Sequence, residues 1–268
     1  MILNHTIYDN GSNNWIVFVH GIGGSTLTWK KQIESFSKDY NLLLIDLPGH
    51  GGSVVKKDEK ITVKMVNSGI KETLDHLNIK KADFVCMSLG TLVVAHFAIK
   101  YPEYVSAIVF GGTIIKVEGI YKGLMNLVIK TKKLLPHRFL YNIFAHVIMP
   151  KRNHKKSRKI FIRESLKMKR QTFFSWIDYM YEITKPDKLI AKLKKLGIDM
   201  LFVSGEEDAV FIKGAKAVAD AVSKTKFKVI KKCGHVCTIE KYQDFNEMSL
   251  NFLEKVHKPK NNMMPILA

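Results

Sequence analysis

The 268-residue sequence predicts an α/β protein, with a doubly wound, mostly parallel sheet and an inserted helical cap. Short apolar runs, bounded by glycines and other turn residues, alternate with stretches whose apolar residues recur at helical spacing. Between residues 113 and 186 this alternation stops, and only helical patterns remain. We therefore expect a core formed by residues 1–112 and 187–268, with residues 113–186 as the cap.

The strands of the predicted sheet are short runs rich in Val, Ile, Leu and Phe. Continuous apolar runs of this kind are expected of parallel strands that helices cover on both faces. Amphipathic stretches lie between most of them and predict crossover helices. The strand candidates span residues 15–19, 41–45, 82–87, 105–110, 200–204 and 227–230, and the clearest helix candidates of the first half span 26–38, 64–78 and 91–100.

The predicted cap combines amphipathic helices with a large positive charge. The helical patterns cover residues 122–135, 138–148 and 157–168. The whole chain has a formal net charge of +19, and residues 116–170 hold sixteen Lys or Arg against two acids, Glu118 and Glu164. One interpretation is a solvated basic face. Because Leu, Ile, Phe and Met are interleaved with the basic residues, the other is peripheral contact with an anionic membrane surface, or an anionic substrate.

Composition and motifs also exclude several classes of protein. The N-terminus lacks the regions of a signal peptide, and no stretch offers the ~18 uncharged apolar residues that a membrane span needs. The three cysteines, Cys86, Cys233 and Cys237, are an odd number, which favours free thiols. We therefore expect a cytoplasmic protein, at most peripheral to a membrane. No nucleic-acid-binding motif and no Walker-type phosphate loop is present, so neither nucleic acid nor nucleotide is expected as a partner.

Ser88 interrupts the apolar stretch FVCMSLG at residues 84–90. It follows a predicted strand and precedes a predicted helix, and the residues two positions away, Cys86 and Gly90, are small. A tight strand-to-helix turn needs small residues there, because larger side chains would collide with the neighbouring backbone. Such a turn exposes the hydroxyl at the carboxyl end of the sheet, where open α/β sheets bind ligands. The alternative is a serine that caps the next helix.

Four further loops follow predicted strands and carry polar or glycine-rich motifs. The first is HGIGG at residues 20–24, whose backbone N–H groups could face a developing oxyanion, and the second is DLPGHGGS at residues 46–53. The sequence GEED at residues 205–208 ends a later strand, and Gly234 and His235 follow the last one. Because the carboxyl ends of parallel strands meet at one edge of a sheet, these loops are expected to converge near Ser88.

Together these motifs resemble those of the α/β-hydrolase superfamily, in particular its capped esterase, haloperoxidase-like and lactonase-like branch. The serine, the acid and the histidine occur in the order that is typical of this family. The resemblance implies that Ser88 is the nucleophile, His235 the base and Asp208 the acid that orients the base. It also implies an oxyanion hole formed by the backbone N–H groups of Ile22 and Leu89.

The sequence departs from the family pattern at three positions. Cys86 stands where the commonest form of the serine motif has glycine, but a thiol is small enough for the turn. Tyr242 and Asp199 each replace a proline that is frequent in relatives, one after the glutamate corresponding to Glu240 and the other before the strand that leads to the acid. None of the three belongs to the reacting groups, so the implied chemistry is unaffected.

The resemblance therefore implies a cofactor-free serine hydrolase that cleaves a small-molecule carboxylic ester, with an apolar acyl chain held under the cap. A carbon–carbon bond hydrolase, a thioesterase or a lactonase could use the same triad. A noncatalytic ligand receptor, or a peripheral membrane protein on a hydrolase scaffold, is a further alternative. The sequence makes no prediction of the oligomeric state.

Several other polar residues are given structural roles. Glu206 and Glu207 could replace Asp208 as the acid, but their spacing from Gly205 makes solvated side chains the better interpretation. His50, His76 and His96 are expected to be structural or exposed. No metal site is expected, because Cys233, His235 and Cys237 lack a second pair of ligands elsewhere in the sequence.

Overall fold

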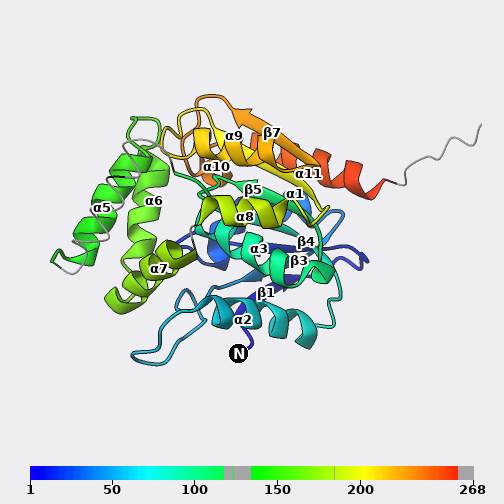
Figure 1. Ribbon diagram of the computed structural model, residues 1–268, viewed down its shortest axis with the longest axis horizontal. Helices are drawn as coiled ribbons and strands as arrows, with labels where there is room; N and C mark the ends of the chain where they lie inside the picture. Colours follow the sequence, from blue (N-terminus) through cyan, green and yellow to red (C-terminus); the bar gives the residue numbers. More distant parts are fainter. Residues whose placement is uncertain (118–122, 124–133, 184, 259–268) are drawn as a thin grey trace, which may run out of the picture.

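The computed structural model describes residues 1–117, 123, 134–183 and 185–258. Within them, seven strands form a single sheet in the order β1-β3-β2-β4-β5-β6-β7, and every neighbouring pair is parallel except β1 with β3 (Figure 1). The predicted doubly wound, mostly parallel sheet is therefore confirmed. The strands are β1 (His5–Tyr8), β2 (Trp15–Val19), β3 (Asn41–Ile45), β4 (Ala82–Met87), β5 (Val105–Gly111), β6 (Asp199–Gly205) and β7 (Thr225–Ile230).

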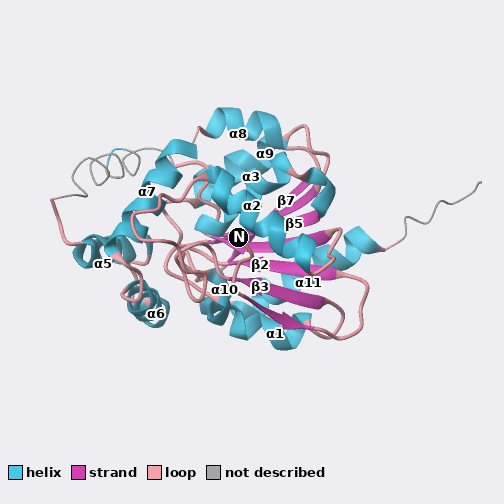
Figure 2. Ribbon diagram, turned by 90° about the horizontal axis from the view of Figure 1, so that it is seen from below, coloured by secondary structure: helices cyan, strands magenta, loops and turns pink. Residues whose placement is uncertain are grey.

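Helices cover both faces of the sheet (Figure 2). Successive residues of a strand point to opposite faces, so Val17 and Val19 pack into one buried cluster while Ile16 and Phe18 pack into the other. The first cluster includes side chains of α2 (Val63–His76), α3 (Leu89–Lys100), α8 (Pro186–Leu193) and α9 (Ile212–Ala221), and the second includes those of α1 (Lys30–Phe36) and α11 (Tyr242–His257). The shorter helices are two 3₁₀ turns, Thr26–Trp29 and Pro102–Tyr104, and α10 (Cys237–Glu240).

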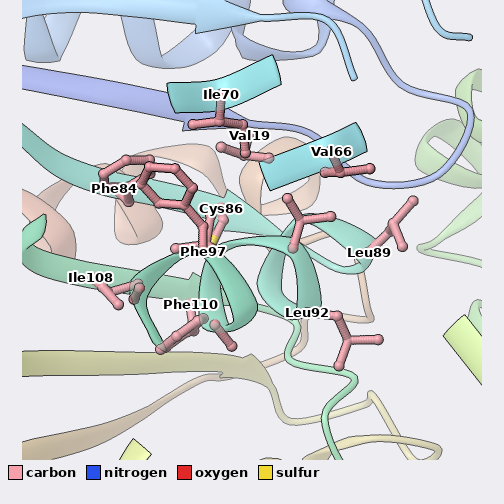
Figure 3. Packing of buried hydrophobic residues seen from close by; sticks show 14 of the residues in the cluster. Val19, Val66, Ile70, Phe84, Cys86, Leu89, Leu92, Phe97, Ile108 and Phe110 are labelled. Carbon is pink, nitrogen blue, oxygen red and sulfur yellow. The ribbon is translucent and has the colours of Figure 1, made fainter. Parts of the chain in front are cut away.

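Helix α3 is the most buried helix against the sheet, and it begins at the residue after Ser88. Its sequence LGTLVVAHFAIK is apolar on nearly all sides, which is typical of a helix that is covered all round. Phe97 packs against Phe84 of β4, with ring centroids 5.4 Å apart, and Leu92 and Phe110 belong to the same buried cluster (Figure 3). Because α3 is held on several sides, its first turn has a fixed position at the carboxyl end of β4.

The predicted strands, and the helices predicted at 26–38, 64–78 and 91–100, agree with the structure to within a few residues. No bounds were predicted for the later helices α8 to α11. The strand β1, of sequence HTIY, was not predicted. It is a short, partly exposed edge strand that pairs antiparallel with β3, so it lacks the continuous apolar run by which the other strands were found. Its register places His5 opposite Ile45 and Tyr8 opposite Leu42.

Three helices lie between β5 and β6 in the described part of the predicted cap: α5 (His137–Ile148), α6 (Lys155–Ser165) and α7 (Arg170–Ile183). The first two correspond to the predicted helices at 138–148 and 157–168, whereas α7 was not singled out. The predicted helix at 122–135 lies almost entirely outside the described residues. Figure 1 shows α5, α6 and α7 grouped at one end of the molecule. The division into a core and a separate cap, at residues 113 and 186, stays a prediction.

Two further features of the described residues bear on the site. None of their helices is both long and apolar enough to cross a bilayer. All three cysteines are free and buried, and burial raises the pKa of each thiol. Cys86 therefore remains a neutral thiol beneath the turn at Ser88, and its Sγ lies 3.4 Å from the carbonyl oxygen of Val109.

Candidate active site

Ser88 lies on a strained turn between β4 and α3. Its backbone has φ +52° and ψ −117°, a conformation that side chains other than glycine rarely adopt. Its N–H donates to the carbonyl of Gly111 on the neighbouring strand, at 3.0 Å. A Cβ on Gly90 would lie 2.3 Å from the carbonyl oxygen of Val19, so only glycine permits this approach of α3 to β2. The turn predicted from the sequence is thus formed, and it directs the Ser88 hydroxyl away from the sheet.

The three residues predicted to form a triad lie in one hydrogen-bonded chain. Nε2 of His235 is 2.9 Å from Oγ of Ser88, and Nδ1 of His235 is 2.8 Å from Oδ2 of Asp208. Asp208 follows β6 and His235 follows β7, so the hydrogen-bonded chain joins the carboxyl ends of β4, β6 and β7. All three side chains are buried, and Ser88, at 7%, is the most exposed of them.

This geometry fixes the role of each ring nitrogen. The carboxylate of Asp208 only accepts, so Nδ1 of His235 must carry the proton in that bond. Nε2 is then free to accept the proton of the Ser88 hydroxyl. A buried carboxylate that holds an imidazole in this tautomer also stabilises the imidazolium that forms when the serine loses its proton. The arrangement can therefore generate a nucleophilic serine oxygen.

The glycine-rich loop after β2 passes directly over Ser88. A Cβ on Gly21 would lie 3.1 Å from Cβ of Ser88. The carbonyl of Gly21 accepts hydrogen bonds from Gly24 N–H at 3.0 Å and from Nδ1 of His20 at 2.7 Å. In a trans peptide the N–H points opposite to the C=O, so the N–H of Ile22 points away from these two donors.

His20 is the buried anchor of this loop. Its Nε2 accepts from Leu47 N–H at 3.1 Å while Nδ1 donates to Gly21 O, which defines a neutral ring with one tautomer. Burial lowers the pKa of His20 and so favours that neutral form. On the other side of Ser88, Leu89 is the first residue of α3, where backbone N–H groups have no intrahelical acceptor. The two predicted oxyanion donors, Ile22 and Leu89, therefore belong to segments that meet at Ser88.

A cavity of about 50 Å³ lies above Ser88 and His235. One face of α6 forms part of its wall, through residues three or four positions apart. Met87 lines the cavity and is also packed in the core. The lining is mainly apolar and comprises Gly21, Ile22, Gly23, Gly24, Thr28, Met87, Ser88, Ser157, Ile160, Phe161, Glu164, His235, Val236 and Ile239.

Comparison with known proteins agrees with this architecture. Residues 14–137 match the family model described as the alpha/beta hydrolase fold. The chain has the α/β-hydrolase fold. The structure of MenH from S. aureus superposes with a TM-score of 0.78 at 21% identity, covering 96% of this chain and 99% of that one. The α/β-hydrolase fold that the sequence motifs implied is therefore confirmed.

Curated relatives match about two fifths of this chain. The (E)-2-((N-methylformamido)methylene)succinate hydrolase of Acinetobacter baylyi is 28% identical over 115 residues, which are 43% of this chain and 41% of the relative. The pimeloyl-[acyl-carrier protein] methyl ester esterase of Wigglesworthia glossinidia brevipalpis is 34% identical over 97 residues, 36% of this chain and 35% of the relative. These matches span about two fifths of the length of the curated relatives.

The acidic neighbours of Asp208 differ from each other, and the expectation that both are solvated is wrong for Glu207. The Glu207 side chain is 13% exposed and contacts three residues in the segment that leads into α6. Its oxygens lie 2.8 Å from Nζ of Lys151, from Nδ2 of Asn153 and from Nε2 of His154. No local sequence signal could reveal this cluster, because more than fifty residues separate Glu207 from its partners.

Glu240 makes the equivalent contact on the histidine side. Its carboxylate accepts from Gly234 N–H at 2.7 Å and from the Ser157 hydroxyl at 3.0 Å. The start of α6 is therefore hydrogen-bonded to the loop that carries Asp208 and, through Glu240, to the loop that carries His235.

His50, His76 and His96 were expected to be structural or exposed, and their burial is consistent with this. His50 is buried beside His20, with ring centroids 4.9 Å apart, His76 is exposed and His96 is partly buried. Among the described residues, no group of three His, Cys, Asp or Glu side chains is arranged to hold a metal ion.

We predict that Glu207→Gln destabilises the protein near neutral pH and that the difference disappears in acid. The hydrogen bonds from Asn153 and Lys151 lower the pKa of Glu207 to about 2. The pKa of a glutamate in an unfolded chain is about 4.3. A depressed carboxyl pKa contributes stability that is complete above the unfolded value and is lost as the pH falls toward the folded value. The melting temperature should therefore be lower for the variant above about pH 5, and the two proteins should converge between about pH 4.5 and 2.

The control is Glu206→Gln, because Glu206 accepts from the backbone N–H of Lys232 rather than from α6. Thermal unfolding of the three proteins over this pH range measures the effect. The melting temperature of Glu207→Gln could instead stay below that of wild type by the same amount at every pH, or Glu206→Gln could show the full decrease as well. Either result would show that the ionised carboxylate of Glu207 does not hold α6.

Proposed function

We propose that this protein is a serine hydrolase that cleaves carboxylic esters through Ser88, His235 and Asp208. One observation carries the proposal: the hydroxyl of a serine on a strained strand-to-helix turn is hydrogen-bonded to a histidine, at 2.9 Å, whose other ring nitrogen is hydrogen-bonded to a buried carboxylate, at 2.8 Å. A serine that merely caps α3 would use its oxygen on the N–H groups of the helix, and Ser88 makes no such side-chain bond.

In the proposed reaction, Oγ of Ser88 attacks the ester carbonyl carbon while Nε2 of His235 takes its proton. The negative charge that develops on the carbonyl oxygen is stabilised by the N–H groups of Ile22 and Leu89. When the tetrahedral intermediate collapses, the imidazolium gives its proton to the leaving alcohol, and an acyl-enzyme on Ser88 remains. Water, deprotonated by His235, then attacks the acyl carbonyl and releases the acid.

The cavity supports an apolar acyl group of small size. Its wall includes Ile160 and Phe161 of α6 and Val236 beside the histidine. A volume of about 50 Å³ accommodates only a few water-sized groups, so a short acyl chain fits without movement of α6. One relative is named as a methyl ester esterase, which is consistent with ester cleavage. Lactone, thioester or carbon–carbon bond cleavage by the same residues is the alternative within enzymes, and ligand binding without turnover is the alternative outside them.

Ser88→Ala should abolish hydrolysis of p-nitrophenyl butyrate and labelling by a fluorophosphonate probe. The hydroxyl supplies the attacking atom, whereas its removal deletes a single small group and changes little packing, so the melting temperature should be nearly unchanged. A panel of p-nitrophenyl esters of increasing chain length measures the acyl preference of the wild-type protein. Wild-type turnover that survives in Ser88→Ala would contradict the assignment, and a wild-type protein that neither turns over nor labels would favour the ligand-binding alternative.

Asp208→Asn should reduce kcat by about 10⁴-fold, the loss typical of triads without the orienting carboxylate. An amide can donate to Nδ1 of His235 and so favours the wrong tautomer. Glu206→Gln is the matched control, since it removes one charge from the same loop without touching His235. If Glu206→Gln caused the large loss and Asp208→Asn did not, the acid would have been assigned to the wrong residue.

We further propose that α6 contacts an anionic surface such as a lipid bilayer. Lys155, Lys156, Lys159 and Arg163 form a basic ridge on the exposed side of this helix, opposite the face that lines the cavity. Between residues 134 and 170 there are eleven Lys or Arg and a single acid, Glu164. A bilayer is favoured over a small anion because large apolar side chains are exposed nearby.

These exposed apolar residues are Phe139 and Ile143 on α5, which packs beside α6, and Leu166 just after α6, with exposed fractions of 53%, 40% and 43%. A basic residue close to an anionic bilayer contributes about 1 kcal/mol, so several acting together could retain the protein there. This attraction is screened over about 8 Å at physiological ionic strength, which makes it sensitive to salt.

Wild-type protein should therefore sediment with anionic vesicles of phosphatidylserine and phosphatidylcholine at low salt, and much less with neutral vesicles or at high salt. The variant Lys155→Glu/Lys156→Glu/Lys159→Glu should lose this binding and keep its hydrolysis of a small neutral ester. The control Lys188→Glu/Lys192→Glu/Lys195→Glu changes the charge equally at exposed positions on and just after α8. Equal loss in both variants would reduce the effect to net charge, and absence of binding by the wild-type protein would leave the ridge as a solvated face.

A further inference from the structure

The peptide unit between Ile22 and Gly23 is held at both of its polar ends. The hydroxyl of Tyr141, on α5, donates to the carbonyl oxygen of Ile22 at 2.7 Å. The N–H of Gly23 donates to Nε2 of His50 at 3.0 Å. Because a peptide unit is planar, fixing its oxygen and its N–H fixes the orientation of the whole plane. This plane is joined through the Cα of Ile22 to the N–H that we assign to the oxyanion hole.

Tyr141 is built into α5 as a rigid donor. Its side chain is 2% exposed, and its ring packs against Phe161 of α6 and Phe173 of α7, with centroids 4.6 Å and 5.5 Å away. Burial raises the pKa of the Tyr141 phenol well above its usual value, so the hydroxyl keeps its proton at any working pH. Gly23, at φ +74°, is needed beneath it, since a Cβ there would fall 2.4 Å from the phenol oxygen.

His50 is an equally well-defined acceptor. Burial and the neighbouring His20 lower its pKa well below the usual value, so its ring is neutral and Nε2 keeps a free electron pair. Trp176 of α7 packs against the His50 ring, at 5.6 Å between centroids, and donates from its indole nitrogen to the carbonyl of Pro48 at 3.0 Å. Helices α5 and α7 thus support the two sides of the same peptide.

We propose that Tyr141 is a positioning residue, through which α5 holds the Ile22 N–H in the direction of the Ser88 oxygen. This inference rests on the proposed function, because the oxyanion role of Ile22 belongs to it. The other hydrogen bonds of the loop come from the core: His20 and Gly24 fix the Gly21 carbonyl, and His50 fixes the Gly23 N–H. Tyr141 supplies the hydrogen bond from α5 to this loop. Without its hydroxyl, the buried carbonyl oxygen of Ile22 would lose this donor.

The test compares Tyr141→Phe with Tyr179→Phe. Tyr179 is a second buried tyrosine, on α7 and 1% exposed, whose hydroxyl has no hydrogen-bond partner among the described residues. Both variants remove one buried oxygen and keep the ring, so they differ in the bond to Ile22. Tyr141→Phe should lower kcat for p-nitrophenyl butyrate by about 10-fold to 100-fold, less than the 10²–10³ typical of deleting an oxyanion donor itself. Tyr179→Phe should stay within about twofold of wild type.

Further measurements separate positioning from a general structural defect. In Tyr141→Phe, KM and the pH at half-maximal activity should be unchanged, because the cavity wall and the His235–Asp208 pair are intact. Hydrogen–deuterium exchange of the segment 21–24 should be faster in Tyr141→Phe than in wild type or Tyr179→Phe. Wild-type kcat in Tyr141→Phe, equal losses in both variants, or unaltered exchange of this segment would each overturn the inference.

The same experiment distinguishes failure of the inference from failure of the proposed function. A wild-type protein that hydrolyses no ester and takes up no fluorophosphonate would overturn the function. In that case the exchange of segment 21–24 still decides whether Tyr141 orders this loop. If the wild-type protein is active, and Tyr141→Phe has the same activity and the same exchange rate in segment 21–24, the inference alone is overturned.

Discussion

The close contact between the first turn of α3 and the backbone at the end of β2 is the constraint on which the site depends. Gly90 lets α3 approach the carbonyl of Val19, and the approach forces Ser88 into its left-handed conformation. The strain is local, whereas the packing that maintains it extends over α3 and the central strands. The consequence is a hydroxyl held at a defined height above the sheet, within reach of loops from three other strands.

Those loops are held in turn by the helices above them. Tyr141 contacts the loop after β2, the start of α6 contacts Glu207 in the loop after β6, and Ser157 contacts Glu240, which binds the N–H of Gly234. Each loop that contributes to the site at Ser88 therefore has a polar partner between β5 and β6. In this arrangement the helices do more than cover a pocket, because they also share in the hydrogen bonding that orders the site. A change in the position of α5 or α6 would therefore shift the loops that carry the reacting groups.

Much of the core could be predicted from the sequence because its strands are buried on both faces and so appear as continuous apolar runs. The edge strand β1 lacks that signal, since half of it faces solvent. The positions of Ser88, Asp208 and His235 could be predicted because each follows a strand, and parallel topology brings strand ends together. The partners of Glu207 and the bond from Tyr141 to Ile22 could not, since they depend on how helices far away in sequence pack above the sheet. Spacing from Gly205 suggested a solvated Glu207, whereas three residues of the segment between α5 and α6 partner it.

The three buried thiols surround the reacting groups: Cys86 lies two residues before Ser88, and Cys233 and Cys237 lie two residues to either side of His235. Since the thiolate is the reactive form, burial and a raised pKa make all three sulfurs inert in the folded chain. Alkylation by a small thiol reagent then requires that β4 or the segment around His235 opens. The rate of alkylation therefore measures local unfolding at the two places where the nucleophile and the base are held, and the measurement needs no substrate.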